Sequence, residues 1–270
     1  MYSDEDIKSE IKKYTFYHKI KIKDDIFTRE TENEHFSHRR LFKYIDDLDL
    51  RGKKVLDIGC RDGIFSFYAE KKGAKEIVAI DNNISKGAVN FLIPYFNSKV
   101  KMYEKNLYEL TENDFGKFDV IFFFGVLYHL REPITAIRKL SDILNEKGLI
   151  LCETAITDNI ETKPLIYIPF KTGPNPEDPT SCTFFNTRGL EETFDSLNFE
   201  IILIEKFIKR KFANIKKIIK NFFWLISEKN RIFNKDLVIT NRVLLIASKN
   251  SNKQNRTRDY WYGIHKEHQK

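Results

Sequence analysis

Short apolar runs alternate with amphipathic stretches through the middle of the chain. The runs are rich in β-branched and aromatic residues, which is typical of strands buried in a parallel sheet. The expected strands are Val55–Ile58, Ile77–Asp81, Val100–Glu104, Phe118–His129 and Leu149–Thr154. The expected helices are Ile64–Glu70, Ser85–Phe91 and Ile134–Leu144, the last with Pro133 in its first turn. Strands that alternate with helices predict an α/β protein with a mostly parallel sheet.

Both ends of the chain depart from this pattern. Residues 1–52 are charged and have helical spacing near His38–Leu48, so they predict a mostly helical leader that covers the sheet. Near the other end, a helix Arg188–Leu197 and a strand Glu200–Glu205 precede a last strand, Arg242–Ala247, which we expect to pair antiparallel with the strand before it. The expected division is a leader, one domain and a polar tail, at residues 1–52, 53–249 and 250–270.

Two insertions interrupt the domain. Residues 155–186 are irregular and rich in proline, and they begin where a strand ends, so they predict a lid over a binding site. Residues 208–236 contain an expected basic amphipathic helix, Lys209–Lys229, with one apolar face. That helix predicts contact with an anionic membrane surface or RNA, or packing on its own domain or on a second subunit in a homo-oligomer.

Composition limits the class of protein. The chain has 270 residues, a formal net charge of +7 and three cysteines, and its charges are mixed along the sequence. Nucleic acid is therefore an allowed partner without being a required one. The cysteines show neither metal-ligand spacing nor a disulfide framework, and no apolar run is long enough to span a bilayer. We expect a soluble, cytoplasmic protein without a metal site.

The first two expected strands end in residues that suit a nucleoside. Gly59 and Gly63 let the backbone turn tightly after Asp57, so a ligand over the turn meets backbone instead of side chains. Asp81 follows about twenty residues later, the spacing at which a carboxylate accepts two ribose hydroxyls. Further expected contacts are Cys60, Arg61, Asn82 and Asn83 on the two loops, and Asn106, Leu107 and Tyr108 where an adenine would lie.

The turn also discriminates between nucleosides. A dinucleotide site needs a third glycine beside the pyrophosphate, and Phe65 stands at that position. Asp57 favours a cationic ligand, such as the ammonium and sulfonium of S-adenosylmethionine. The stretch Val55–Gly63 resembles motif one of the class I S-adenosylmethionine-dependent methyltransferases, with Arg61 in place of the middle glycine. This resemblance implies a Rossmann-like, doubly wound sheet, and a βαβ turn without a ligand is the alternative.

A second segment, Phe124–Pro133, resembles the bacterial tRNA wobble-uridine carboxymethyltransferases and the wider group related to them. The resemblance implies cofactor contacts at Gly59, Asp81–Asn83, Leu107, Tyr108, Phe124, Tyr128 and Arg242. It also implies that a relative using carboxy-S-adenosylmethionine grips the extra carboxylate from its leader, where Lys19, Phe36 and Arg39 lie at or near matching positions. This chain lacks most of the corresponding N-terminal extension, so S-adenosylmethionine is the favoured cofactor.

Methyl transfer is an in-line displacement that needs alignment and exclusion of water instead of a metal. An oxygen acceptor also needs a base, and His129, expected at the end of the central strand, titrates near neutral pH. Tyr128 is expected to orient cofactor or acceptor, and Arg131 to hold an anionic acceptor or to solvate the next helix. Further candidate bases, each more typical of a surface position, are His18, His35 and His38.

These residues predict an S-adenosylmethionine-dependent methyltransferase that methylates an oxygen of a sugar-containing or other small acceptor. The alternative acceptor is tRNA, modified at its wobble uridine. From a different class, the chain would be a non-catalytic nucleoside-binding or membrane-docked scaffold. Asp81→Ala separates the two enzymes from the scaffold, since only the enzymes would lose their function together with cofactor binding.

Overall fold

The computed structural model describes residues 2–31, 38–157, 163–168, 180–207 and 240–252. Several predictions lie outside these residues: the Lys209–Lys229 helix, His35, Phe36, half of the expected lid and most of the polar tail. Within the described part, no helix is both long and apolar enough to cross a bilayer.

Strands and helices alternate along the chain, as the apolar pattern predicts. The strands are β1 (Lys21–Lys23), β2 (Ile26–Phe27), β3 (Lys54–Ile58), β4 (Glu76–Asp81), β5 (Lys101–Glu104), β6 (Phe118–Phe124), β7 (Leu144–Thr157), β8 (Ile166–Tyr167), β9 (Phe184–Phe185), β10 (Phe199–Phe207) and β11 (Thr240–Lys249). The helices are α1 (Asp4–Lys12), α2 (His38–Asp46), α3 (Ile64–Lys71), α4 (Ile93–Phe96), α5 (Glu112–Phe115), α6 (Pro133–Ile143) and α7 (Thr187–Ser196). Short helical turns are η1 (Ala88–Leu92), η2 (Leu107–Glu109) and η3 (Leu127–His129).

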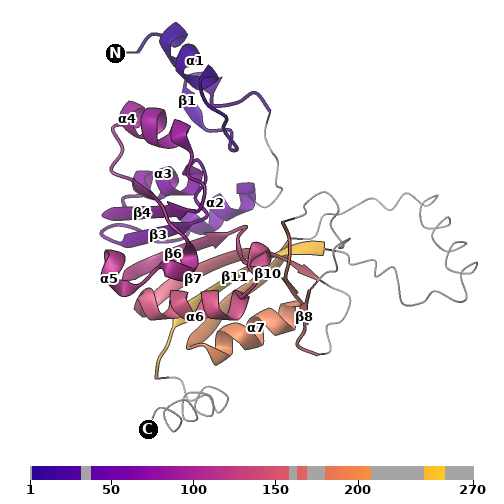
Figure 1. The fold of residues 1–270 in the computed structure, drawn as a ribbon. Coiled ribbons are helices and arrows are strands. Elements are labelled where there is room, and N and C mark those ends of the chain that lie inside the picture. Colours follow the sequence, from indigo (N-terminus) through magenta and orange to yellow (C-terminus); the bar gives the residue numbers. More distant parts are fainter. Residues whose placement is uncertain (1, 32–37, 158–162, 169–179, 208–239, 253–270) are drawn as a thin grey trace, which may run out of the picture.

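The main sheet has the strand order β10-β11-β7-β6-β3-β4-β5 (Figure 1). Neighbours from β7 to β5 run parallel, whereas β11 pairs antiparallel with both β7 and β10. The chain passes from β3 to β4 and β5 on one side and then crosses to β6 and β7 on the other. The order therefore reverses between β3 and β6, where sheets of this kind bind ligands. The predicted mostly parallel sheet with an antiparallel last strand is confirmed.

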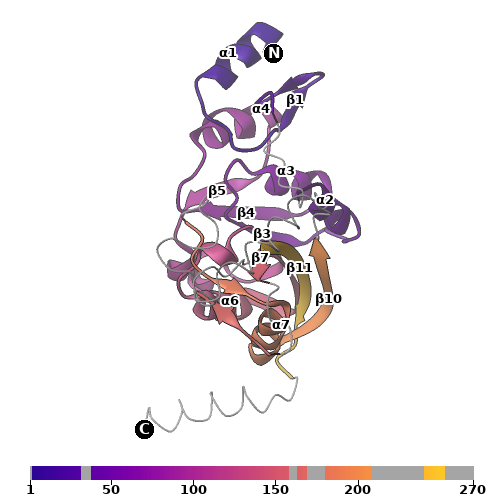
Figure 2. The ribbon, with the colours of Figure 1, turned by 90° about the vertical axis from the view of Figure 1, so that its right-hand side faces the viewer.

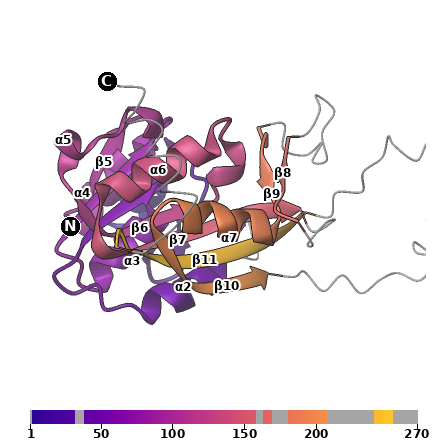
Figure 3. The same ribbon diagram turned by 90° about the horizontal axis from the view of Figure 1, so that it is seen from below.

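Helices cover both faces of the sheet (Figure 3). Successive strand residues point to opposite faces, so Phe123 packs with α6 and α7 while Phe122 packs with α2 and α3. Leu140 of α6 and Leu41 of α2 are both fully buried in these two layers. Each such side chain contributes about 1.5–3 kcal/mol on burial, which fixes the strands whose ends carry the site.

The leader contains a hairpin between its two helices. α1 and β1 lie beside α4 (Figure 2), where Ile7, Phe16 and Phe91 share a small core with η1. Gly87 permits this contact, because a Cβ at that position would lie 2.5 Å from Phe16 Cζ. Of the described leader elements, α2 is the one in the sheet's core. The leader is thus only partly helical, and its first half packs against η1 and α4 instead of covering the sheet.

Strand β6 ends earlier than its apolar run predicts. Gly125 has a φ of 71°, and its N–H donates to the carbonyl of Glu153 at 2.8 Å. Because this left-handed conformation terminates the strand, the chain turns into η3. Tyr128 and His129 consequently lie on a 3₁₀ turn beyond the strand, although the sequence predicts one continuous strand to His129.

Candidate active site

A cavity of about 540 Å³ lies beyond the carboxyl ends of β3, β4 and β6. Cavities of this size are typical of small-molecule sites. The predicted site residues that line it are Asp57, Gly59, Arg61, Asp81, Asn82, Asn106, Leu107, Phe124, Tyr128, His129 and Arg242. Local motifs on separate strands therefore converge on one space.

The turn after β3 brings backbone to the cavity wall. Gly59 has a φ of 70°, and its N–H donates to the carbonyl of Ile80 at 2.8 Å, which ties the turn to β4. A Cβ on Gly59 would lie 2.4 Å from Val126 Cγ2. Glycine is therefore required both by the backbone conformation and by the close approach of the next loop.

We expect Gly59→Ala to destabilise the protein by about 2–5 kcal/mol. The left-handed conformation costs an alanine about 1–2 kcal/mol, and the clash with Val126 adds about 1–3 kcal/mol. Urea unfolding measures the difference, and Gly52→Ala is the matched control because Gly52 has a φ of 72° with open space around its Cβ position. If both variants lost the same free energy of unfolding, the Val126 contact would not contribute to the cost of Gly59→Ala.

Asp57 lies on β3, directly before the turn. Its side chain is 1% exposed, and its Oδ2 accepts a hydrogen bond from Ser66 Oγ at 2.5 Å. Burial raises the pKa of the Asp57 carboxyl to about 7, and the neighbouring Asp81 contributes to the rise. A cationic group in the cavity would stabilise the ionised form. This position therefore suits a cation better than an anion.

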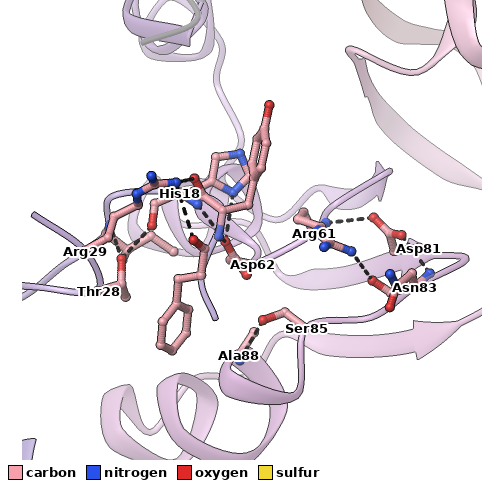
Figure 4. A network of polar contacts seen from close by, with 12 residues as sticks. His18, Thr28, Arg29, Arg61, Asp62, Asp81, Asn83, Ser85 and Ala88 are labelled. Carbon is pink, nitrogen blue, oxygen red and sulfur yellow. Dashed lines mark hydrogen bonds and ion pairs between the residues drawn. The ribbon is translucent and has the colours of Figure 1, made fainter. Parts of the chain in front are cut away.

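Asp81 ends β4 with both of its oxygens oriented by backbone. Oδ2 accepts the N–H of Arg61 at 3.0 Å and Oδ1 accepts the N–H of Asn83 at 2.9 Å (Figure 4). The Arg61 guanidinium donates to the Asn83 carbonyl at 2.9 Å, so the two loops are joined around this carboxylate. A carboxylate oxygen has two lone pairs, so each can still accept a ligand hydroxyl.

Residues after β5 form a second wall. Asn106 caps η2, because its Oδ1 accepts the N–H of Tyr108 at 2.9 Å, and Leu107 lies in the cavity wall while mostly buried. The Tyr108 hydroxyl instead accepts the N–H of Glu132 at 3.1 Å. Leu107 thus offers an apolar surface to a flat ligand, whereas Tyr108 fixes the start of α6.

Arg242 forms an ion pair between β11 and β7. Its Nε and Nη2 contact the two carboxylate oxygens of Glu153 at 2.5 and 2.6 Å, and Glu153 is 1% exposed. The guanidinium also lies 4.9 Å from the centroid of the Tyr128 ring. Burial opposes the charge, but the Glu153 carboxylate outweighs it and raises the pKa of Arg242 above its ordinary range. The cavity therefore has a cation here that is already neutralised.

The end of the expected lid packs along η3. The backbone N–H groups of Cys182 and Thr183 both donate to the Tyr128 carbonyl, at 2.9 and 3.1 Å. Thr180 Oγ1 lies 2.9 Å from His129 Nδ1, and both residues line the cavity. These contacts bring a segment about fifty residues away in sequence to the site's rim.

The leader contributes another wall through Tyr17 and His18. Asp62, 1% exposed within the turn, accepts the backbone N–H groups of Tyr17 and His18 on its Oδ2 at 2.6 and 2.7 Å. His18 is 8% exposed. The expectation of a surface histidine is therefore wrong, because the Asp62 contacts hold it against the turn.

Comparisons with known proteins agree with this geometry. A family described as a methyltransferase domain matches residues 33–204. The chain belongs to this family. The tRNA U34 carboxymethyltransferase of Campylobacter hominis is 38% identical over 117 residues, which are 41% of this chain and 39% of that protein. The Helicobacter pylori protein of the same name is 35% identical over 113 residues, which cover 41% and 43%. The methyltransferase is thus aligned with about two fifths of these relatives' length.

Solved structures share its fold at low identity. The N-terminal domain of EvdMO1 with SAH bound is 12% identical, covers 93% of this chain and 98% of that chain, and has a TM-score of 0.63. An S-adenosylmethionine-dependent methyltransferase from Mesorhizobium loti is 14% identical, covers 78% and 96%, and has a TM-score of 0.54. These likenesses concern the fold alone. Together with the family match, they confirm the predicted class I methyltransferase fold.

Several predicted residues lie outside the cavity wall of the methyltransferase: Cys60, Gly63, Asn83, Tyr108, Lys19, Arg39 and Arg131. Lys19 donates to the Glu30 carbonyl at 3.0 Å and lies over the Phe27 ring. Arg39 and Arg131 are exposed. Since these side chains face the hairpin or solvent, their predicted substrate contacts stay predictions.

Sequence reasoning did not assign to the site other residues that line it: Tyr17, Ile58, Phe65, Ile80, Lys105, Gly125, Val126, Leu130 and Thr180. Phe65 had a usable signal, because it occupies the position where a glycine would admit a pyrophosphate. Tyr17 and Thr180 had none, since only the tertiary contacts of Asp62 and η3 bring them to the cavity.

Proposed function

We propose that this methyltransferase binds S-adenosylmethionine and transfers its methyl group to an oxygen of a small acceptor, with a sugar-containing molecule as the first candidate. The observation that carries the proposal is the pair of carboxylates, Asp57 and Asp81, beside a glycine turn in a cavity of about 540 Å³. A metal is not needed for this chemistry, and the described residues contain no group of three suitable metal ligands.

The residues present fit this cofactor. Asp81 would accept the ribose hydroxyls, Leu107 would contact the adenine, and Asp57 would face the cationic methionine end. The cofactor supplies an electrophilic methyl group on a sulfonium. The chain supplies alignment, and the buried rings of Phe65 and Phe124 in the cavity wall limit the access of water.

The wall near Arg242 supports a neutral acceptor. Phe65, Phe124 and Tyr128 are each less than one-tenth exposed and line the cavity, so they offer ring surface to a sugar or another small molecule. Arg242 is already paired with Glu153. An acceptor phosphate would therefore compete with a buried carboxylate for this cation.

The same ion pair favours S-adenosylmethionine over its carboxylated form. An extra carboxylate beside the methyl carbon would need a cation in the enclosure. Among the described wall residues, Arg242 is paired with Glu153 and Lys105 with Asp114 at 2.7 Å. Arg61, the remaining arginine of the wall, donates to the Asn83 carbonyl at 2.9 Å beside Asp81, where the ribose would lie. A further buried anion is costly without a partner of its own, which supports the unmodified cofactor.

tRNA is the second candidate acceptor, because the relatives aligned above are named for tRNA U34. The formal net charge of +7 is compatible with a polyanion. A non-catalytic scaffold, peripheral membrane contact, a homo-oligomer and a cytoplasmic location stay predictions.

The acceptor is tested by transfer of label from methyl-labelled S-adenosylmethionine into a cell extract separated into RNA and low-mass fractions. Label in the low-mass fraction supports the proposal. Nuclease-sensitive label in RNA would make tRNA the acceptor. Cofactor binding without label in either fraction would favour carboxy-S-adenosylmethionine or a scaffold.

Binding of S-adenosylmethionine is expected to release protons near pH 7. The folded-state pKa of Asp57, about 7, lies above the ordinary value of about 3.9, so its contribution to stability is present below about pH 4 and is lost as pH rises through about 7. A cationic ligand would favour ionisation and displace the proton. Calorimetry in buffers of different ionisation enthalpy measures the release, which Asp57→Asn should abolish and Glu104→Gln, at an exposed position, should keep.

A further inference from the structure

We propose that His18, placed in the cavity wall by the leader, accepts the proton of the acceptor hydroxyl, and that Asp62 of the turn after β3 positions it. The inference rests on the proposed function, since it names the base that transfer to an oxygen requires. It differs from the sequence prediction, which gives this role to His129.

The backbone around His18 is fixed on both sides (Figure 4). Asp62 accepts the N–H groups of Tyr17 and His18, as described above. Thr28 Oγ1 donates to the His18 carbonyl at 2.5 Å, and Arg29 Nη1 donates to the Tyr17 carbonyl at 2.8 Å. Four backbone groups are thereby held by three side chains, so the position of the imidazole is preorganised.

The His18 ring lies against a buried carboxylate. Its Nδ1 is 3.5 Å from Asp62 Oδ2, and the ring packs edge-on against Tyr17 with centroids 4.8 Å apart. Burial raises the pKa of Asp62, but the hydrogen bonds from His18 outweigh it and leave a net lowering. The carboxylate therefore stays ionised and favours a proton on Nδ1, with Nε2 on the opposite side of the ring as the basic nitrogen. Contacts of this kind often shorten when a ligand binds.

His129 has a different environment. Its Nδ1 lies 2.9 Å from the neutral hydroxyl of Thr180, and its carbonyl accepts the Cys182 thiol at 3.1 Å. These contacts suit a residue that holds the returning end of the lid. His18 is the one of these two histidines that lies beside a buried carboxylate, which can orient its imidazole for proton transfer.

The proposed step is balanced in atoms and charge. The acceptor oxygen forms an O–C bond to the methyl carbon as the S–C bond breaks, and that bond's electron pair stays on sulfur. The acceptor proton passes to Nε2 of His18. One positive charge leaves the sulfonium and one appears on the imidazole beside Asp62, so the net charge of the enclosure is unchanged.

The experiment compares His18→Gln, His129→Gln and Asp62→Asn in the full chain. Label transfer into the fraction that the wild-type protein labels measures kcat, calorimetry with S-adenosylhomocysteine measures cofactor binding, and ¹⁵N NMR of histidine-labelled protein reports the neutral tautomer of His18. We expect His18→Gln to lower kcat by about 10²- to 10⁴-fold with unchanged S-adenosylhomocysteine affinity, and His129→Gln to have a smaller effect.

The Asp62→Asn variant separates positioning from folding. With its amide oxygen in the place of Oδ2, the variant can still accept the two backbone N–H groups, whereas the negative charge beside Nδ1 is lost, so the share of the Nδ1–H tautomer of His18 should fall. An Nε2–H tautomer in the wild-type protein, or wild-type kcat in His18→Gln, would overturn the inference alone. A wild-type protein that binds no S-adenosylhomocysteine and labels no fraction would instead contradict the proposed function.

Discussion

Asp81→Ala is expected to lower the affinity for S-adenosylmethionine by about 10²- to 10⁴-fold. A hydrogen bond to a charged group contributes about 1.5–3 kcal/mol, two ribose hydroxyls are involved, and each 1.4 kcal/mol is a factor of ten. The variant also removes the acceptor of the Arg61 and Asn83 N–H groups, so the two loops lose their common anchor. Calorimetry with S-adenosylhomocysteine, which carries the same ribose, measures the loss of affinity that the ribose contacts cause.

Glu104→Ala is the matched control for this experiment. Glu104 is the register partner of Asp81 on β5, and it is exposed and absent from the cavity wall. The Glu104→Ala change removes one carboxylate at the same carboxyl end of the sheet, and it should leave the affinity for the cofactor unchanged. If Asp81→Ala bound as tightly as Glu104→Ala, the ribose would have to lie elsewhere.

Arg242→Met is expected to lower the free energy of unfolding by about 3–5 kcal/mol. The change leaves the Glu153 carboxylate, 1% exposed, without its bidentate partner in the middle of the sheet. Glu153→Gln should cost less, because the Arg242 side chain is 21% exposed and faces the cavity, where water can solvate it. Urea unfolding of both variants gives the two values.

The double variant Glu153→Leu/Arg242→Met tests whether the unpaired Glu153 carboxylate causes the loss of stability in Arg242→Met. Replacing a whole buried pair by apolar residues is often neutral or stabilising, so the double variant should regain most of the stability lost in Arg242→Met. A double variant as unstable as Arg242→Met would mean that lost packing, instead of the stranded charge, dominates.

The sequence predicted those parts of the site that are local to one strand and its turn. Asp57 and Gly59 are two residues apart, and Asp81 follows at a spacing that the β3–α3–β4 unit dictates, so periodicity was sufficient to place them. The same reasoning placed Arg242 in an antiparallel last strand, which pairing with β7 and β10 bears out.

The rest depended on contacts between distant segments. Asp62 accepts hydrogen bonds from Tyr17 and His18, which are 45 and 44 residues away in sequence. No pattern within the leader predicts that contact. The end of β6 was misjudged because Gly125 interrupts an otherwise continuous apolar run, and only its left-handed backbone separates a strand residue from a turn residue.

The register of the last two strands has a consequence for the long stretch between them. Phe207 and Arg242 are direct partners on β10 and β11, although residues 208–239 separate β10 from β11 in sequence. Antiparallel neighbours need only a turn of about two to five residues. The pairing of β10 with β11 therefore requires only a short turn after Phe207, and we expect the strand order to stay the same when residues 208–239 are replaced by such a turn. A variant shortened in this way would test the contacts predicted for Lys209–Lys229 separately from those of the cavity.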